Sequence, residues 1–330
     1  MRVRLGDYIK EYSVRNKAGE DIPVYSVTNT QGFCRDYFGK EVASKDKSTY
    51  KIVPKGYFAY NPSRINVGSV DWQRNEDRVI VSPLYNVFSV ANELNQQYLY
   101  YYLKSDITLH RIKSIATGSV RDNLKFDMLS EFKINLPNVN KQISIINILD
   151  KIGMLIRKQQ TEIEKLDDLI KSRFVELFGD PIMNPKGWEV VTIGDITTEV
   201  RYGTSKPAVE GGKYPFLRMN NLTIDGHLDL TELKYIDIPD DEIEKCVVRK
   251  GDILFNRTNS IELVGKTAVF DFPDDMVIAG YIIRVRLNTK MLPEVLSQYM
   301  NLEAIKDILR SMAKGAVNQA NINAQELQSI

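Results

Sequence analysis

The feature that most constrains the fold of this 330-residue chain is an internal repeat. Three short patterns from the first half return in the second half, in the same order. The spacing between matched residues grows slightly along the chain, as loop insertions would cause, and Ala320 is one extra residue in the last match. We therefore expect one domain used twice. The patterns are Leu5–Ile9, Lys55–Asn61 and Thr117–Leu124, echoed by Ile193–Ile196, Lys250–Asn256 and Lys314–Ile322.

Each copy has the same order of predicted elements. An extended region with Pro and Gly breaks leads to a Lys-Gly turn and a strand that ends in Asn. Further strands follow at residues 79–90 and 277–287, and a helix closes each set at residues 95–115 and 293–313. The second of these helices repeats its apolar residues with a helical period. The pattern predicts an α+β fold in two tandem domains.

A long amphipathic helix is predicted between the copies, over Gln142–Phe178. Pro137 precedes it and Gly179-Asp180-Pro181 ends it. Every heptad a position is Leu or Ile, which favours a coiled coil of about 55 Å over a helix packed on its own domain. Gln159 and Arg173 are polar at d positions. The residues expected at a subunit interface are Leu149, Ile152, Ile156, Ile163, Leu166, Ile170 and Leu177.

The composition is that of an ordinary globular protein without a membrane span or a secretory signal. Lys and Arg number 44 against 43 Asp and Glu, so bulk charge alone does not hold nucleic acid. A basic face is still expected in residues 31–64, which contain seven basic and three acidic residues. Cys34 and Cys246 are far apart and read as free thiols, which favours a cytoplasmic protein.

Motifs for catalysis are absent from the sequence. His110 and His227 have no nearby Cys or His, so no metal site is expected. Gly265-Lys266-Thr267 lacks the first Gly of a P-loop, and its apolar flanks read as a strand. There is no G-x-S-x-G motif, and Asn61-Pro62-Ser63-Arg64 lacks the second Pro and the aromatic residue of the adenine-methyltransferase box. The chain is therefore expected to be non-catalytic and to hold no cofactor.

Several segments together resemble the specificity subunit of type I restriction-modification systems. The resemblance covers essentially the whole chain and depends on the order of its motifs more than on any one of them. The Gly-x-x-x-x-Asn loops at Gly118 and Gly315 also fit. The other motifs are Phe132–Pro137 followed by Gln142, Leu177–Pro181, Pro185–Glu189, and Ile193-Gly194-Asp195.

The resemblance implies two target-recognition domains, at residues 1–137 and 180–330, joined by a spacer helix at 138–179. Each domain would read one half of a split target in double-stranded DNA. Two methyltransferase subunits and the restriction subunits would dock on the helices, and those partners would hold S-adenosylmethionine, ATP and Mg. A spacer of about 55 Å exceeds one turn of DNA, which is about 34 Å long.

Candidate DNA contacts are chosen by side-chain chemistry, because Arg can bridge guanine and Asn or Gln can pair with adenine. A structural role stays open for each of them, above all for Asn61 and Asn256, which recur at matching positions. The candidates are Arg35, Lys40, Asn61, Arg64, Arg121 and Asn123 in copy one and Arg218, Asn220, Asn256, Arg257, Asn318 and Gln319 in copy two.

Copy two stops at Leu327–Ile330, which aligns with Leu129–Phe132 in the middle of a motif. The second long helix of the family is therefore expected to be missing, as in a truncated member, a fragmentary gene, a recombining cassette or an incomplete sequence. We expect part of the helical seam to be uncovered and available for self-association. Two other functions stay open: a scaffold that presents two interaction modules on a coiled coil, and an enzyme in its own right.

Overall fold

The computed structural model describes residues 2–35, 47–116, 123–313 and 320–330. They form two compact units, Met1–Lys158 and Gln159–Ile330. The boundary falls inside the long helix, so the predicted spacer at 138–179 contributes its first part to unit 1 and its second part to unit 2. Each unit is described separately below.

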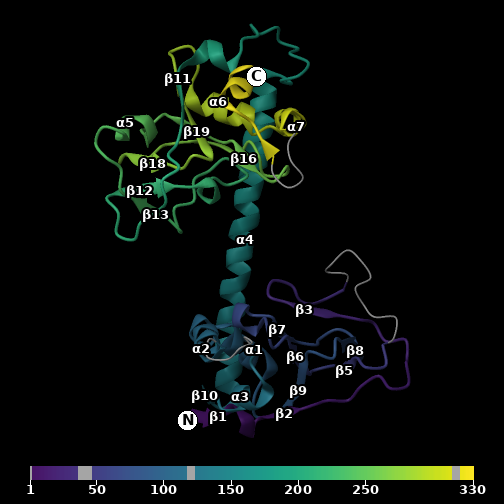
Figure 1. The fold of residues 1–330 in the computed structure, drawn as a ribbon. Coiled ribbons are helices and arrows are strands. Elements are labelled where there is room, and N and C mark those ends of the chain that lie inside the picture. The colour runs from purple at the N-terminus through teal and green to yellow at the C-terminus, as the bar shows by residue number, and fades with distance from the viewer. Residues whose placement is uncertain (1, 36–46, 117–122, 314–319) are drawn as a thin grey trace. The chain divides into compact units, whose positions relative to one another are not determined.

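Unit 1 is built on a four-stranded antiparallel sheet (Figure 1). Its order is β2 (Ile9–Glu11), β9 (Asn86–Val90), β6 (Phe58–Tyr60) and β7 (Val70–Trp72). Phe58 and Phe88 are paired across β6 and β9, and their rings stack 5.0 Å apart in the core. Three further strand pairs lie among the described residues of unit 1: β1 (Arg2–Arg4) with β10 (Lys133–Asn135), β3 (Ser26–Thr28) with β4 (Gly32–Cys34), and β5 (Lys51–Pro54) with β8 (Arg78–Val81).

In the described part of unit 1, four α-helices belong wholly or partly to the unit. They are α1 (Gln96–Lys104), α2 (Asp106–Ala116), α3 (Phe126–Ser130) and the first part of α4 (Val139–Phe178). Leu99, Leu103 and Ile112 of α1 and α2 are fully buried in the same core as Phe58 and Phe88. Their burial fixes the two helices against the sheet.

Unit 2 repeats the four-stranded sheet in the same order. The strands are β11 (Thr197–Tyr202), β19 (Ile282–Leu287), β15 (Ile253–Asn256) and β17 (Thr267–Val269). A second sheet runs β13 (Lys234–Ile236), β12 (Tyr214–Leu217), β18 (Met276–Ile278) and β14 (Val247–Val248), and β16 (Thr258–Asn259) pairs with β20 (Ala320–Asn321). The helices are α5 (Ile243–Cys246), α6 (Pro293–Met300), α7 (Glu303–Met312) and α8 (Ala324–Gln328).

Matching backbone hydrogen bonds confirm the internal repeat. The amide of Leu5 donates to the carbonyl of Phe132 at 2.7 Å, and the amide of Ile193 donates to the carbonyl of Ile330 at 2.8 Å. These bonds join the opening of each copy to its end, at the residues that the sequence alignment pairs. The predicted α+β class in two tandem copies is therefore confirmed.

The predicted single helices at 95–115 and 293–313 are wrong, because each is two helices. Ser105 has an extended backbone (ψ 144°), which ends the first helix. Its hydroxyl donates a hydrogen bond to the carbonyl of Tyr102 at 2.8 Å. In the second copy Leu302 is extended in the same way, with ψ 141°. The breaks leave the apolar period intact, since Leu296 and Leu309 on either side of the second break are both buried. Periodicity alone therefore did not show them.

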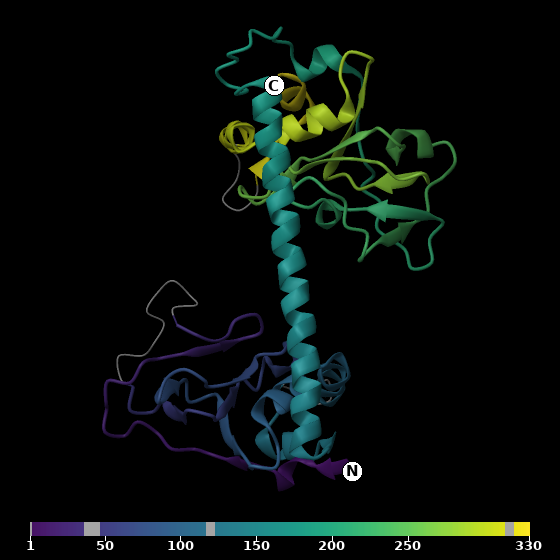
Figure 2. The same ribbon diagram turned by 180° about the vertical axis from the view of Figure 1, so that it is seen from behind.

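The long helix α4 is confirmed and begins three residues earlier than predicted (Figure 2). Gly179 ends it in the left-handed region, with φ +88°, and its amide donates to the carbonyl of Val175 at 2.8 Å. The last carbonyls also find partners, because Lys186 Nζ donates to Leu177 at 2.7 Å and the Trp188 indole donates to Phe178 at 2.8 Å. These bonds satisfy the end of the helix.

The heptad seam of α4 is largely open to solvent in this chain. Of the seven predicted interface residues, only Leu149 is half-buried, and Ile163 and Leu166 are each 57% exposed. The buried apolar anchors are instead Ile146 in unit 1 and Phe174 in unit 2, each one residue past a d position. The helix therefore attaches to both units through residues beside the seam and leaves the seam itself uncovered.

Candidate nucleic-acid interface

The loop after β6 carries two of the predicted contact residues of unit 1. Asn61 opens a 3₁₀ turn, where its carbonyl accepts from the amides of Arg64 and Ile65 and its side chain accepts from Ser63 at 3.0 Å. This is the turn-forming role that had been left open for Asn61. The turn leaves the Arg64 side chain exposed on the surface.

A second segment of unit 1 is held against this loop. The Leu124 amide donates to the carbonyl of Pro62 at 3.1 Å, and the hydroxyl of Ser63 donates to the side-chain oxygen of Asn123. The structure therefore brings Asn61, Arg64 and Asn123 to one surface. A depression of about 420 Å³ lies beside them, lined by Glu11, Pro62, Asn86, Asn123, Lys125, Phe126 and Asp127.

Arg35 lies in a different environment. Its guanidinium carbon is 5.4 Å from the centre of the Tyr25 ring, and its Nη2 is 4.0 Å from a carboxylate oxygen of Glu76. Burial is the main cause that raises the pKa of Tyr25. Within the described residues, these contacts of Arg35 are with Tyr25 and Glu76 and not with the Asn61 loop. Lys40 and Arg121 lie outside the described residues.

In unit 2 the strand β15 ends at Asn256, which is fully buried. Its amide donates to the carbonyl of Lys266 at 2.8 Å, and its side-chain oxygen accepts from Asn259 at 3.3 Å. A buried amide of this kind favours the structural role left open for Asn256. The next residue, Arg257, lies with its guanidinium 4.9 Å from the centre of the Tyr202 ring. Its Nε is buried without a hydrogen-bond partner among the described residues.

The same loop-to-segment bond that marks unit 1 recurs here. The amide of Ile322 donates to the carbonyl of Arg257 at 2.9 Å, just as Leu124 donates to Pro62. Both bonds hold the residues that follow the Gly-containing loop against the end of the central strand. Asn318 and Gln319, in that loop of unit 2, lie outside the described residues.

Arg218 and Asn220 lie in a separate turn, after β12. The Arg218 amide donates to the side chain of Asn221 at 2.9 Å, and its guanidinium donates to the carbonyl of Glu232 at 3.2 Å. Asn220 is exposed. The buried Lys266 connects this turn to Asn256, because its ammonium donates to the carbonyls of Met219 and Leu222 at 2.7 and 2.5 Å.

The environment of Lys266 also argues against a P-loop at Gly265-Lys266-Thr267. Burial lowers the pKa of this lysine, and its partners are backbone carbonyls. Thr267 begins strand β17, whereas a P-loop would lead into a helix. The predicted strand is confirmed at Thr267–Val269 but is wrong for Leu263 and Val264, which lie in a turn whose amides donate to the carbonyl of Ser260.

Two neighbours of the predicted contacts were missed. Lys125 lines the depression beside Asn123, and Tyr202 stacks on Arg257. Lys125 could have been predicted from the sequence, since it follows Asn123 by two residues. Tyr202 could not have been predicted in this way, because only the fold brings it next to Arg257. The acids Glu11 and Asp127 line the same depression as Lys125, so this surface has mixed charge.

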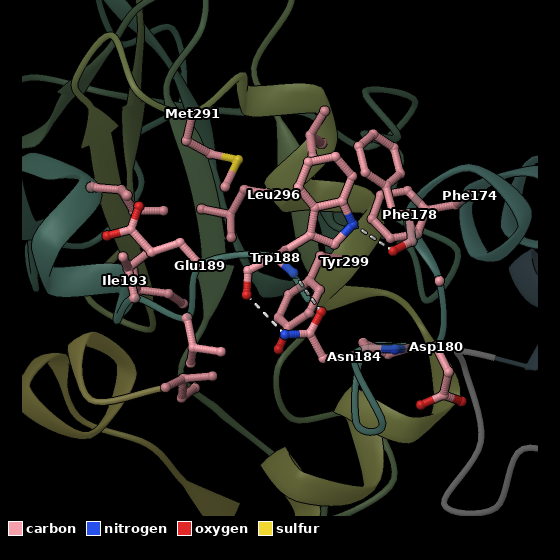
Figure 3. A pocket seen from close by; sticks show the side chains of 17 residues that line it. Phe174, Phe178, Asp180, Asn184, Trp188, Glu189, Ile193, Met291, Leu296 and Tyr299 are labelled. Carbon is pink, nitrogen blue, oxygen red and sulfur yellow. Dashed lines mark hydrogen bonds between the residues drawn. The ribbon is translucent and has the colours of Figure 1, made fainter. Parts of the chain in front are cut away.

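Unit 2 also contains an apolar cavity of about 250 Å³ at the end of α4 (Figure 3). Aromatic rings of Phe174, Phe178, Trp188 and Tyr299 line it together with Met291 and Leu296. Such a cavity can accept an apolar segment, since few polar groups converge on it. Together with the exposed apolar residues of the α4 seam, it is a candidate surface for another protein segment in the described part of unit 2.

Cys34 and Cys246 are both free. Among the described residues, no helix has the length and apolar character needed to cross a bilayer.

Comparison with known proteins assigns the chain to a family. Residues 5–166 and 185–330 match the type I restriction modification DNA specificity domain. The chain is 23% identical over 249 residues to the type I restriction enzyme EcoKI specificity subunit of Escherichia coli, covering 70% of this chain and 53% of that protein. It is 30% identical over 241 residues to the MjaIX specificity subunit of Methanocaldococcus jannaschii, covering 65% of this chain and 53% of that protein.

A solved structure shares the fold. It comes from a study of complex assembly and conformational transition of the type I R-M system, with a TM-score of 0.51 and 17% identity, and covers 100% of this chain and 84% of that one. This chain thus spans about half the length of the two curated relatives. Because the family match covers both copies of the repeat, the chain belongs to the family of type I restriction-modification DNA specificity proteins.

Proposed function

We propose that this chain reads a bipartite sequence in double-stranded DNA, one half with each unit. The supporting observation is the repeated bond from Leu124 to Pro62 and from Ile322 to Arg257. It presents the same two segments in both units, as expected if each unit reads one half-site. Two short half-sites can together discriminate well, because each mismatched base pair costs roughly 1–3 kcal/mol.

We choose the proposed contacts with bases or phosphates by the exposure and the unpaired donors of their side chains. Arg64 and Asn123 in unit 1 and Asn220 and Arg257 in unit 2 offer side chains at the surface or have donors without partners among the described residues. Arg can bridge the O6 and N7 atoms of guanine, and Asn can pair with adenine. Arg35 is a weaker candidate, since Tyr25 and Glu76 already contact its guanidinium. Arg218 donates to the carbonyl of Glu232, but its Nε, like that of Arg257, has no hydrogen-bond partner among the described residues.

The catalytic steps are assigned in this proposal to other subunits. Two methyltransferase subunits and the restriction subunits would dock on α4 and beside the apolar cavity, and would hold S-adenosylmethionine, ATP and Mg. In support, the relatives are named as specificity subunits, and the α4 seam offers apolar side chains without a protein cover in this chain. A helix of 40 residues is about 60 Å long and would set the separation of the half-sites.

Co-expression with a cognate methyltransferase subunit tests the proposal. Mapping of methylated adenines in the host genome should reveal a split motif. Replacing residues 180–330 with the matching part of a relative should change one half of the motif and leave the other half intact. Methylation that ignores swaps of both units would overturn the DNA-reading function and favour the scaffold alternative.

Self-association through the seam is part of the same proposal. In sedimentation at micromolar concentration we expect a dimer, and Ile163→Glu should weaken association at least about 100-fold, because each copy would bury a carboxylate. Thr161→Glu adds the same single charge two residues away, at an exposed site outside the a and d positions, and is the matched control. A wild-type chain that stays monomeric would exclude this use of the seam.

A further inference from the structure

Three side chains that commonly bind metals meet in unit 2, and none of them is among the predicted DNA contacts. Asp167 lies on α4, and Asp225 and His227 lie in the loop between β12 and β13. One possible ligand atom from each lies within 4.8 Å of the other two. The imidazole Nε2 of His227 is 3.5 Å from a carboxylate oxygen of Asp167.

One acceptor of the cluster has no partner in the part of the chain that the structure describes. Oδ1 of Asp225 is buried and has no hydrogen-bond partner among the described residues. A buried acceptor without a partner is unfavourable, and two carboxylates at this separation repel each other. A bound cation would offset both costs.

The loop that carries two of the ligands is held in place from behind. The amide of His227 donates to the hydroxyl of Thr223 at 2.9 Å, and the amide of Thr223 donates to the carbonyl of His227 at 3.0 Å. Gly226 has φ +92°, and a Cβ there would lie 2.4 Å from Nδ2 of Asn301. That Nδ2 is itself fixed by the carbonyls of Thr267 and Ser297. The ligand side chains are therefore presented by a rigid turn.

The spacing suits a small divalent ion. Two bonds of about 2.1 Å at a tetrahedral angle place their ligand atoms about 3.4 Å apart, close to the separation of His227 and Asp167. One imidazole and two carboxylates match first-row transition metals better than Mg or Ca, which prefer oxygen ligands alone.

We propose that Asp167, Asp225 and His227 bind one divalent transition-metal ion, with zinc as the best match. The ion ties the loop between β12 and β13 to α4 within unit 2. Three protein ligands leave one position for water. This proposal departs from the absence of a metal site expected from sequence, and it does not depend on DNA reading.

The full-length chain, stripped with a chelator, provides the test. Zinc added to it should bind with one ion per chain in calorimetry and raise the Tm of unit 2 by about 5 °C at a hundred-fold excess over Kd. Because the chain has only two histidines, NMR of histidine-labelled protein should show one imidazole shifting on zinc addition. His110→Gln assigns that signal to His227.

Variants identify the ligands. His227→Gln and Asp225→Asn should each weaken zinc binding at least about tenfold, whereas His110→Gln should leave it unchanged. Cys34→Ser checks that the half-buried thiol is not the binding group. Zinc that leaves the His227 resonance unmoved in the wild-type protein would overturn the proposal without any variant having to fold. Binding that survives both ligand substitutions, or Mg binding with equal affinity, would overturn it as well.

Discussion

Unit 1 and unit 2 each contain a four-stranded sheet of the same order, but the segments that open the two copies are paired differently. In unit 1, β1 pairs with β10, and the buried Gln142 of α4 fastens the neighbouring loop by accepting from the Asn95 amide and donating to the Glu93 carbonyl, both at 2.8 Å. In unit 2 the residues that match β1 pair with no strand among those described, and Val190 is 86% exposed. The apolar cavity lies beside them.

The central sheet and its helices are packed equally well in the two units. The fully buried Phe255 and Ile283 in unit 2 are as well covered as Phe58 and Phe88 in unit 1. In unit 1 the pair of β1 and β10 also contributes Val3 and Ile134 to this core.

The largest effect on stability is expected from removing the hydrogen bonds of the Gln142 side chain in unit 1. Gln142→Leu deletes three hydrogen bonds, to Asn95, Glu93 and Pro137, and leaves their backbone groups unsatisfied. Unfolding of unit 1 should become easier by about 3 kcal/mol or more. The two tryptophans report separately, since Trp72 is in unit 1 and Trp188 is in unit 2. Equal losses at both probes in urea unfolding would contradict the comparison. Asn147→Ala, at an exposed site on the same helix, is the control.

A matched pair of substitutions sharpens the contrast at the edge itself. Val3 in β1 is buried and Val191 is its counterpart, 42% exposed. Val3→Lys should destabilise unit 1 by about 2 kcal/mol, because a charge replaces a buried side chain. Val191→Lys should change the stability of unit 2 by no more than about 0.5 kcal/mol. Thermal unfolding of both variants measures the difference, and equal effects would mean that the edge of unit 2 is covered.

The smallest effect concerns a repeat position at which unit 2 has a buried lysine and unit 1 has a leucine. Counting from the starts of α2 and α7 places Leu109 of unit 1 at the position of Lys306, whose ammonium donates to the carbonyl of Gly265 at 2.6 Å. Burial lowers the pKa of Lys306 to about 8 from 10.5. Between these pH values the folded state has released a proton that the unfolded state keeps, so stability rises with pH.

Urea unfolding followed at Trp188 should show a rise on the order of 1 kcal/mol per pH unit above pH 8. Lys306→Leu should reduce that rise without abolishing it, because burial lowers the pKa of Lys266 in the same direction. An unchanged pH dependence in this variant would show that Lys306 is solvated.

The sequence was sufficient for the repeat and for α4, because both leave long regular patterns. The alignment of Leu129–Phe132 with Leu327–Ile330 is matched by equivalent hydrogen bonds. It was insufficient for the breaks at Ser105 and Leu302, where one extended residue interrupts a helix without disturbing its apolar period. The stacking of Tyr202 on Arg257 and the cluster at Asp167 join residues far apart in the chain. No local spacing records such contacts.

The two buried anchors of α4, Ile146 and Phe174, lie beside the heptad seam and not on it. Substitutions along the seam can therefore change the binding partner of the helix, while each unit stays attached to α4 through its own anchor. Substitutions in the loops at Arg64 or Arg257 can alter the surface of a module without touching the seam. Under the proposed function, choice of partner and choice of target could then evolve independently within one short polypeptide.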